Sequence, residues 1–176
     1  VGQDTTPEQR AEIRQQLGLD DPVIVQFGRF VWRAAHFDFG ISYLNKQKVS
    51  SLIAERFPAT MELALVSALF ALLAGIPMGV YSGLRPHSWL AKLFQTVSLV
   101  GISLPTFLIG ILLIFVFPVS LGVLKSFGRQ GVVDLGWWTT GFLTREGWAS
   151  LILPAITLGL FQMTLIMRLV RSEMME

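Results

Sequence analysis

The sequence predicts an all-α integral membrane protein with three transmembrane helices of one bundle. Hydrophobic residues make up 52% of its 176 residues, and the mean hydropathy is +0.58. Three apolar runs, residues 59–83, 93–117 and 151–170, are each long enough to cross a hydrocarbon core of roughly 30 Å. None of them alternates polar and apolar residues over about 10 positions, as the strands of a membrane barrel would.

Residues 1–56 are polar, and we expect two short helices in them. A helix-start pattern at residues 6–9 and a stop at Gly18 predict the first. The second begins after its expected cap, Asp21, and lies on a surface rather than crossing a membrane. Its apolar stripe consists of Val23, Phe27, Phe30, Val31 and Ala34. Residues 37–51 are expected to form a loop.

The first apolar run carries a small residue at every fourth position. These residues are Ser67, Ala71, Gly75, Gly79 and Gly83. Such a ridge allows another helix to approach closely, and its slow winding round the helix suits a crossing partner. The alternative is that small residues are simply common in membrane helices. Pro77 within the ridge predicts a kink.

Glu62 is the only charged residue in the first apolar run. A carboxylate in a membrane helix is by default a candidate functional residue. Because Glu62 lies close to the start of the run, we favour a first-turn or snorkelling carboxylate that the helix dipole stabilises.

Polar side chains in the second and third runs are candidates for a substrate pathway. The spacing of Ser103, Thr106 and Gly110 places them on one face of a continuous helix, and Pro105 frees a carbonyl beside them. Hydrogen bonding that only holds the helices together explains these residues equally well. The candidate pathway residues are Ser98, Ser103, Thr106 and Gln162.

Loop charges predict the orientation. Arg85 and Lys92 lie in a short connection without acids, and Arg168 and Arg171 emerge on the same side, which the positive-inside rule assigns to the cytoplasm. The N-terminal region, with seven Lys or Arg and seven Asp or Glu in residues 1–58, is then extracytoplasmic. A chain that starts there without a methionine leads us to expect a missing preceding span.

The chain lacks sequence patterns for catalysis. It has no cysteine and no Walker A motif, and both histidines, His36 and His87, lie outside the apolar runs, so that no serine within a run has a histidine partner. A net charge of +2 without a basic cluster argues against nucleic acid as a partner. We therefore expect no enzyme activity, no metal and no cofactor.

Five short motifs cover nearly the whole chain in a characteristic order. They are residues 6–22, 38–42 (DFGIS), 56–65 (RFPATMELAL), 103–110 (SLPTFLIG) and 153–176. Together they resemble the permease subunits of binding-protein-dependent ABC importers, in the dipeptide and oligopeptide branch. Phe37 departs from that pattern, because a glycine often stands before the second motif.

The resemblance implies the fold of a type I ABC importer permease for residues 57–176, in the plasma membrane of a bacterium or archaeon. It implies a second permease subunit, cytoplasmic ATPase subunits that hydrolyse ATP, and an extracytoplasmic binding protein that delivers peptide. Lipid is the other expected partner. The substrate class stays open among dipeptides, longer peptides, glutathione, nickel complexes and some sugars.

Arg168, Arg171 and Glu173 would lead into a cytoplasmic coupling loop, which we expect to be missing here. The small-residue ridge and the polar face would contact the missing helices and the partner permease. A non-transporting scaffold or receptor subunit is the alternative function, and an intramembrane hydrolase has the least support.

Overall fold

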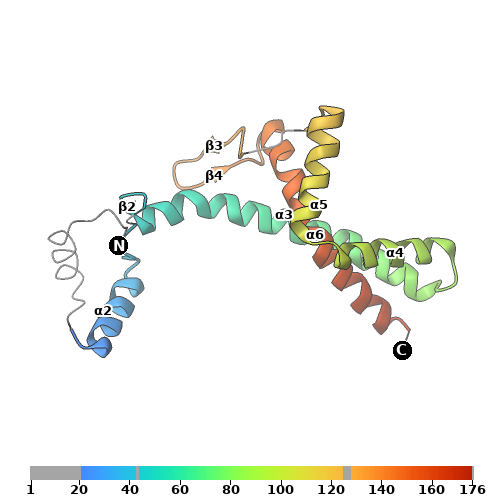
Figure 1. Cartoon of the computed structure of the whole chain (residues 1–176), viewed down its shortest axis with the longest axis horizontal. Coiled ribbons are helices and arrows are strands. Elements are labelled where there is room, and N and C mark those ends of the chain that lie inside the picture. Colours follow the sequence, from blue (N-terminus) through green and yellow to red (C-terminus); the bar gives the residue numbers. More distant parts are fainter. Residues whose placement is uncertain (1–20, 43, 125–127, 176) are drawn as a thin grey trace. The chain divides into compact units, whose positions relative to one another are not determined.

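The computed structural model describes residues 21–42, 44–124 and 128–175, and the chain divides into two units, Val1–Phe57 and Pro58–Glu176. The helix expected at residues 6–18 lies outside the described residues. Helix α3 (Val49–Leu84) begins in the first unit and continues into the second (Figure 1).

The first unit contains α2 (Val23–Ala35) and a short antiparallel hairpin, β1 (Ile41–Ser42) and β2 (Gln47–Lys48). The prediction of a helix after residue 21 is confirmed, but its predicted cap is wrong. The helix starts on the backbone of Pro22, while the Asp21 carboxylate accepts a 2.6 Å hydrogen bond from Arg29. The segment expected to be a loop contains the hairpin and the first turn of α3.

A tight turn follows α2 at the DFGIS motif. Phe37 and Gly40 both have left-handed backbone angles, with φ of 60° and 78°. Asp38 closes the turn, because its carboxylate accepts bonds from Arg33 Nε at 2.9 Å and from the Gly40 amide at 3.1 Å. These bonds, that from Arg33 first, lower the pKa of Asp38 below its ordinary value of 3.8.

Acid should open this turn. A carboxyl whose pKa is lowered by folding contributes stability above its unfolded pKa, and that contribution is lost as the pH falls through the folded pKa. We expect the Gly40 amide resonance to titrate with a midpoint below 3.8, and the protection of the Gly40 amide from exchange, relative to an unfolded peptide at the same pH, to fall only as the pH drops through that midpoint. In Asp38→Asn the titration should be absent. A midpoint at or above the ordinary value would contradict the assignment of the ion pair.

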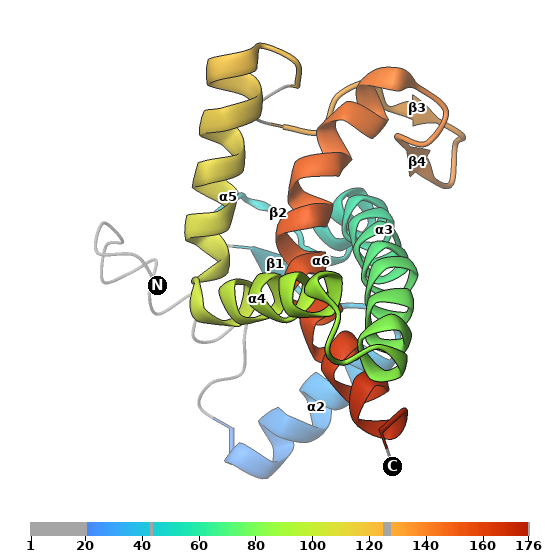
Figure 2. The same cartoon turned by 90° about the vertical axis from the view of Figure 1, so that its right-hand side faces the viewer.

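The second unit contains the rest of α3, then α4 (Trp89–Ser103), α5 (Thr106–Ile114) with a π-helical extension η1 (Phe115–Leu121), and α6 (Arg145–Glu173). Between η1 and α6 lies a small antiparallel hairpin, β3 (Val133–Asp134) and β4 (Thr139–Thr140). Helix α6 packs against α5 and against α4, and Figure 2 shows α4 crossing α6.

The second apolar run is not one helix. Helices α4 and α5 with η1 meet at an angle of 106° across Leu104 and Pro105. Leu104 is extended (φ −92°, ψ 132°), because a residue before proline is pushed out of the helical region, and Pro105 has no N–H to continue the ladder. By length and hydropathy the described residues hold two helices able to cross a membrane, and a third if the bent pair counts as one span.

The outer two spans are longer than the apolar runs that predict them. Helix α3 has 36 residues and continues through Pro58 and Pro77, and α6 has 29 residues. Helix α6 begins six residues before the predicted position 151, because the Thr144 side chain caps it by accepting a 3.0 Å bond from the Gly147 amide. The all-α membrane fold itself is confirmed.

Candidate functional site

The small-residue ridge of α3 packs against α6. All five ridge residues are buried, and Ala71 is fully inaccessible. A Cβ added to Gly75 would lie 2.8 Å from the Met163 carbonyl, and one added to Gly79 would lie 2.7 Å from Val170 Cβ. The approach is reciprocal, since a Cβ at Gly159 of α6 would lie 2.9 Å from the Ser67 carbonyl. The ridge therefore contacts another span of the same chain, whereas we expected the missing helices or a partner permease.

A buried carboxylate joins α3 to the loop before α6. Glu62 is only 1% exposed, and its Oε2 accepts a 2.8 Å bond from Arg129 Nη2. The same carboxylate accepts the Gly141 amide at 3.1 Å. Arg129 also donates to the Thr139 hydroxyl at 2.8 Å and to the Thr139 carbonyl at 2.6 Å. One ion pair thus fixes both ends of the β3–β4 hairpin on α3.

The start of α6 is fixed to the same loop. Gly141 and Gly147 are in backbone contact, so that any side chain on Gly147 would overlap the Gly141 carbonyl. The Thr144 hydroxyl donates to the Gly131 carbonyl, and Trp148 Nε1 donates to the Phe142 carbonyl at 2.9 Å. The loop is consequently held to two spans at once.

The expectation for Glu62 is therefore wrong. It is the fourteenth residue of α3, not a first-turn residue, and it does not reach solvent. Helix α3 starts at Val49, well before the apolar run at residue 59, so the start of the run is not the start of the helix. An isolated charge in a membrane helix is costly, and this cost predicts a cationic partner for Glu62. It does not identify Arg129 as that partner.

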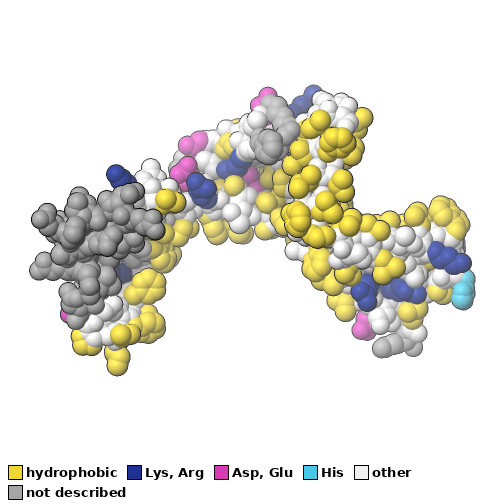
Figure 3. All heavy atoms as spheres, in the orientation of Figure 1, with side chains coloured by type: hydrophobic (Ala, Val, Ile, Leu, Met, Phe, Trp, Pro, Cys, Tyr) yellow, Lys and Arg dark blue, Asp and Glu magenta, His cyan; other side chains and the backbone are white. Residues whose placement is uncertain are grey.

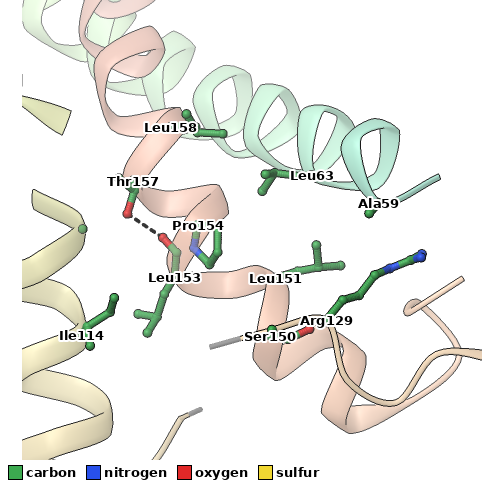
Figure 4. A pocket seen from close by; sticks show the side chains of 12 residues that line it. Ala59, Leu63, Ile114, Arg129, Ser150, Leu151, Leu153, Pro154, Thr157 and Leu158 are labelled. Carbon is green, nitrogen blue, oxygen red and sulfur yellow. Dashed lines mark hydrogen bonds between the residues drawn. The ribbon is translucent and has the colours of Figure 1, made fainter. Parts of the chain in front are cut away.

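A pocket of about 420 Å³ lies between three spans, α3, α5 and α6. Figure 4 shows its apolar walls, with Leu63 on α3 and Ile114 on α5 at opposite sides of Leu153 on α6. Its hydroxyls bond to their own helix: Ser150 donates to the Gly147 carbonyl at 2.8 Å, and Thr157 donates to the Leu153 carbonyl at 2.8 Å. Arg129 also lines the pocket, but its terminal nitrogens already bond to Glu62 and Thr139, so the pocket suits hydrocarbon better than a charged peptide.

The candidate pathway residues do not form one cluster. Ser103 and Thr106 flank the break between α4 and α5, and both are exposed. The shared face expected for them with Gly110 requires a continuous helix, so that part of the prediction is wrong. Ser98 is buried within α4, and Gln162 is exposed on α6. A buried hydroxyl that we did not single out, Thr164, lies where a Gly101 Cβ would come within 2.8 Å.

The chain matches two families whose members are membrane components of transporters. Residues 75–176 match the binding-protein-dependent transport system inner membrane component family, and residues 1–64 match the N-terminal family of the same membrane components. The chain belongs to this permease family. Its members are transport components rather than catalysts, and the family is one of inner membrane proteins.

Curated relatives of the permease family agree. A putative peptide transport system permease protein of Brucella abortus is 41% identical over 178 residues, covering 100% of this chain and 54% of that protein. A glutathione transport system permease protein of Salmonella paratyphi A is 34% identical, covering 94% and 49%. A dipeptide transport system permease protein of Alkalihalophilus pseudofirmus is 32% identical, covering 100% and 56%. The chain spans about half the length of these relatives.

The end of α6 carries the residues that the permease resemblance marks as a coupling lead-in. Arg168 and Glu173 are exposed, and Arg171 is half-buried in the last turns of the helix. Figure 3 shows Lys and Arg side chains gathered around this end and the α3–α4 turn. There Arg85 lies over the Tyr81 ring at 5.9 Å.

Proposed function

We propose that this chain is a membrane-spanning subunit of an ATP-driven importer and forms part of its pathway for peptides. The observation that carries the proposal is the broken span at Leu104 and Pro105, with an exposed hydroxyl on each side of it. Backbone that leaves the helix at membrane depth is tolerated where it is buried in protein or lines a water-filled cavity. In this proposal Ser103 and Thr106 face such a cavity.

Broken spans of this kind build substrate sites in many transporters. The helix ends at a break offer carbonyls and amides that a continuous helix would occupy, and these suit the polar backbone of a peptide. Three spans cannot enclose a pathway, so the proposal includes a second permease subunit. It also includes ATPase subunits on the cytoplasmic side and a binding protein on the opposite side. Arg168, Arg171 and Glu173 would transmit ATPase movement.

Peptides are the proposed substrate class because the relatives above are named for peptides, a dipeptide and glutathione, itself a peptide. The apolar pocket between α3, α5 and α6 is not the proposed peptide site, since its hydroxyls already bond to their own helix.

Bulky substitutions at the break should block uptake. In the transporter assembled with its ATPases and binding protein, Ser103→Trp and Thr106→Trp should lower peptide uptake at least about tenfold, a barrier increase of about 1.4 kcal/mol. The matched control is Ile102→Trp, a neighbouring residue that is also exposed but points away from Ser103 on α4. Uptake of labelled peptide into vesicles measures the effect, with membrane insertion checked separately.

Uptake that is unchanged in both tryptophan variants would contradict the pathway assignment and favour a role of these hydroxyls in helix association. An assembled complex that gives no peptide-stimulated uptake in any variant would favour the scaffold or receptor alternative.

A further inference from the structure

Helix α2 presents an uncovered apolar face. Within the described part of the chain, none of its residues is buried. Phe27 is 67% exposed and Ile24 85%, and Figure 3 shows apolar side chains along this helix. The apolar residues take up well over half of the helix circumference. They are Val23, Ile24, Val25, Phe27, Phe30, Val31, Trp32, Ala34 and Ala35.

The narrow polar stripe of α2, in contrast, is paired within its own unit, although the side chains of Arg29 and Arg33 each stay 46% exposed. Gln26, Arg29 and Arg33 follow one another at i, i+3 and i+7 and so share one face. Gln26 donates to the Asp21 carbonyl at 2.7 Å, Arg29 to the Asp21 carboxylate at 2.6 Å, and Arg33 to the Asp38 carboxylate at 2.9 Å. The DFGIS turn packs beside this stripe.

This arrangement is the reverse of a helix on a water-soluble core, which buries its apolar stripe and leaves its polar side chains to water. Here the polar stripe is paired within the unit, and the apolar face is left to the surroundings. An isolated face of this width and composition in water would invite aggregation.

We propose that α2 lies in the headgroup layer of the membrane, with its apolar face in the acyl chains. Three further observations select lipid as the occupant. Helix α3, a membrane-crossing helix, begins only 14 residues after Ala35, so that the chain itself keeps α2 near a bilayer. Trp32 lies next to the polar stripe, as tryptophan does at membrane interfaces. Apart from the indole N–H of Trp32, the face has no charged or hydrogen-bonding side chain for a protein partner to recognise.

The charges of α2 also predict how it binds. Its two arginines are both paired with aspartates, so the polar stripe offers little free positive charge to anionic lipids. The binding is therefore hydrophobic, in contrast to surface helices whose lysines and arginines attract acidic headgroups. We expect it to occur equally in phosphatidylcholine vesicles and in vesicles that also contain phosphatidylglycerol.

Single cysteines test this cleanly, because the chain has none of its own. The chain is reconstituted in vesicles with a spin label at each position from 23 to 34 in turn. We expect the ratio of accessibility to oxygen, which concentrates in lipid, over a water-soluble nickel complex to oscillate with the helical period. It should be several-fold higher at residues 27 and 30 than at the neighbouring residues 26 and 29.

Each other outcome overturns the proposal. Labels at residues 23, 27 and 30 that are protected from both reagents would place a protein segment on the face, and uniform nickel accessibility would place it in water. A pattern that arises only with phosphatidylglycerol would replace the hydrophobic mode with an electrostatic one. Because the pattern spans a dozen positions, one variant that fails to fold does not remove the test. None of these outcomes depends on transport.

Discussion

Arg129→Met should destabilise the second unit by about 3 kcal/mol, at the low end of the cost of breaking a buried ion pair. The Glu62 carboxylate would stay 1% exposed with uncharged hydrogen bonds from the Thr140 side chain and the Gly141 amide in place of the ion pair, and the β3–β4 hairpin would lose its bonds from Arg129. The low end applies because the guanidinium is 22% exposed and water can reach part of the gap. Unfolding by SDS in mixed micelles, followed by tryptophan fluorescence, measures this, since four of the five tryptophans lie in this unit.

The control is Arg145→Met, which removes an exposed arginine at the start of α6 and should change stability little. Removing both charges in Glu62→Leu with Arg129→Met should recover a large part of the loss, because no uncompensated charge is then buried. If Arg129→Met proves no more harmful than Arg145→Met, or the double variant is the least stable, Glu62 is not held by this pair.

The membrane class and the outer spans were predictable because they depend on length and composition alone. Residues 59–83 and 151–170 are continuous apolar runs, and a run of that kind has few other uses. The ends of the two helices were less predictable, since the turns of α3 and α6 beyond their apolar parts are polar. A capping residue such as Thr144 does not stand out in hydropathy.

The second span shows that a proline in the sequence does not decide whether a membrane helix is kinked or broken. In a membrane helix, proline is compatible with a kink that neighbouring groups repair or with a complete break. Which of the two occurs depends on what packs against residues 104 and 105, and that information is not local. The prediction of a shared face for Ser103 and Thr106 assumed the kink, and the structure has the break.

The Glu62 contacts were beyond sequence reasoning for the same reason. Arg129 lies 67 residues further along the chain and Gly141 lies 79 residues further. Nothing periodic connects the one acid of an apolar run with an arginine in a distant loop. The sequence could indicate that a partner was needed, but only the fold could name it.

The ridge of α3 was predictable as a close-approach surface, whereas its partner was not. Small residues at every fourth position indicate that a helix packs closely against this surface, but any helix of suitable shape could be that partner. The structure shows that α6 is the partner of the ridge. The effect of enlarging a ridge glycine can therefore be predicted at named positions.

Gly79→Ala should force α3 and α6 apart. Its Cβ would lie 2.7 Å from Val170 Cβ and 2.8 Å from the Met167 carbonyl, and a backbone carbonyl cannot rotate away as a flexible side chain can. We expect a net loss of about 2 kcal/mol, since overpacking costs about 1–3 kcal/mol and the gain in helix propensity offsets part of it. Gly75→Ala, opposed by the Met163 carbonyl at 2.8 Å, should behave alike.

The matched control lies in the same bundle. A Cβ on Gly110 of α5 would meet Thr157 Cγ2 at 3.5 Å, an ordinary contact, so Gly110→Ala should be neutral or slightly stabilising. Gly83→Ala should fall between the two, because its one close neighbour, Met174 Cβ at 2.6 Å, lies just beyond the end of α6, where the helix can shift more easily. The order of the SDS midpoints, Gly110→Ala above Gly83→Ala above Gly79→Ala, therefore measures where α3 and α6 touch. Equal midpoints for Gly79→Ala and Gly110→Ala would mean that the ridge faces lipid or another subunit and that the α3–α6 contact is absent in the membrane.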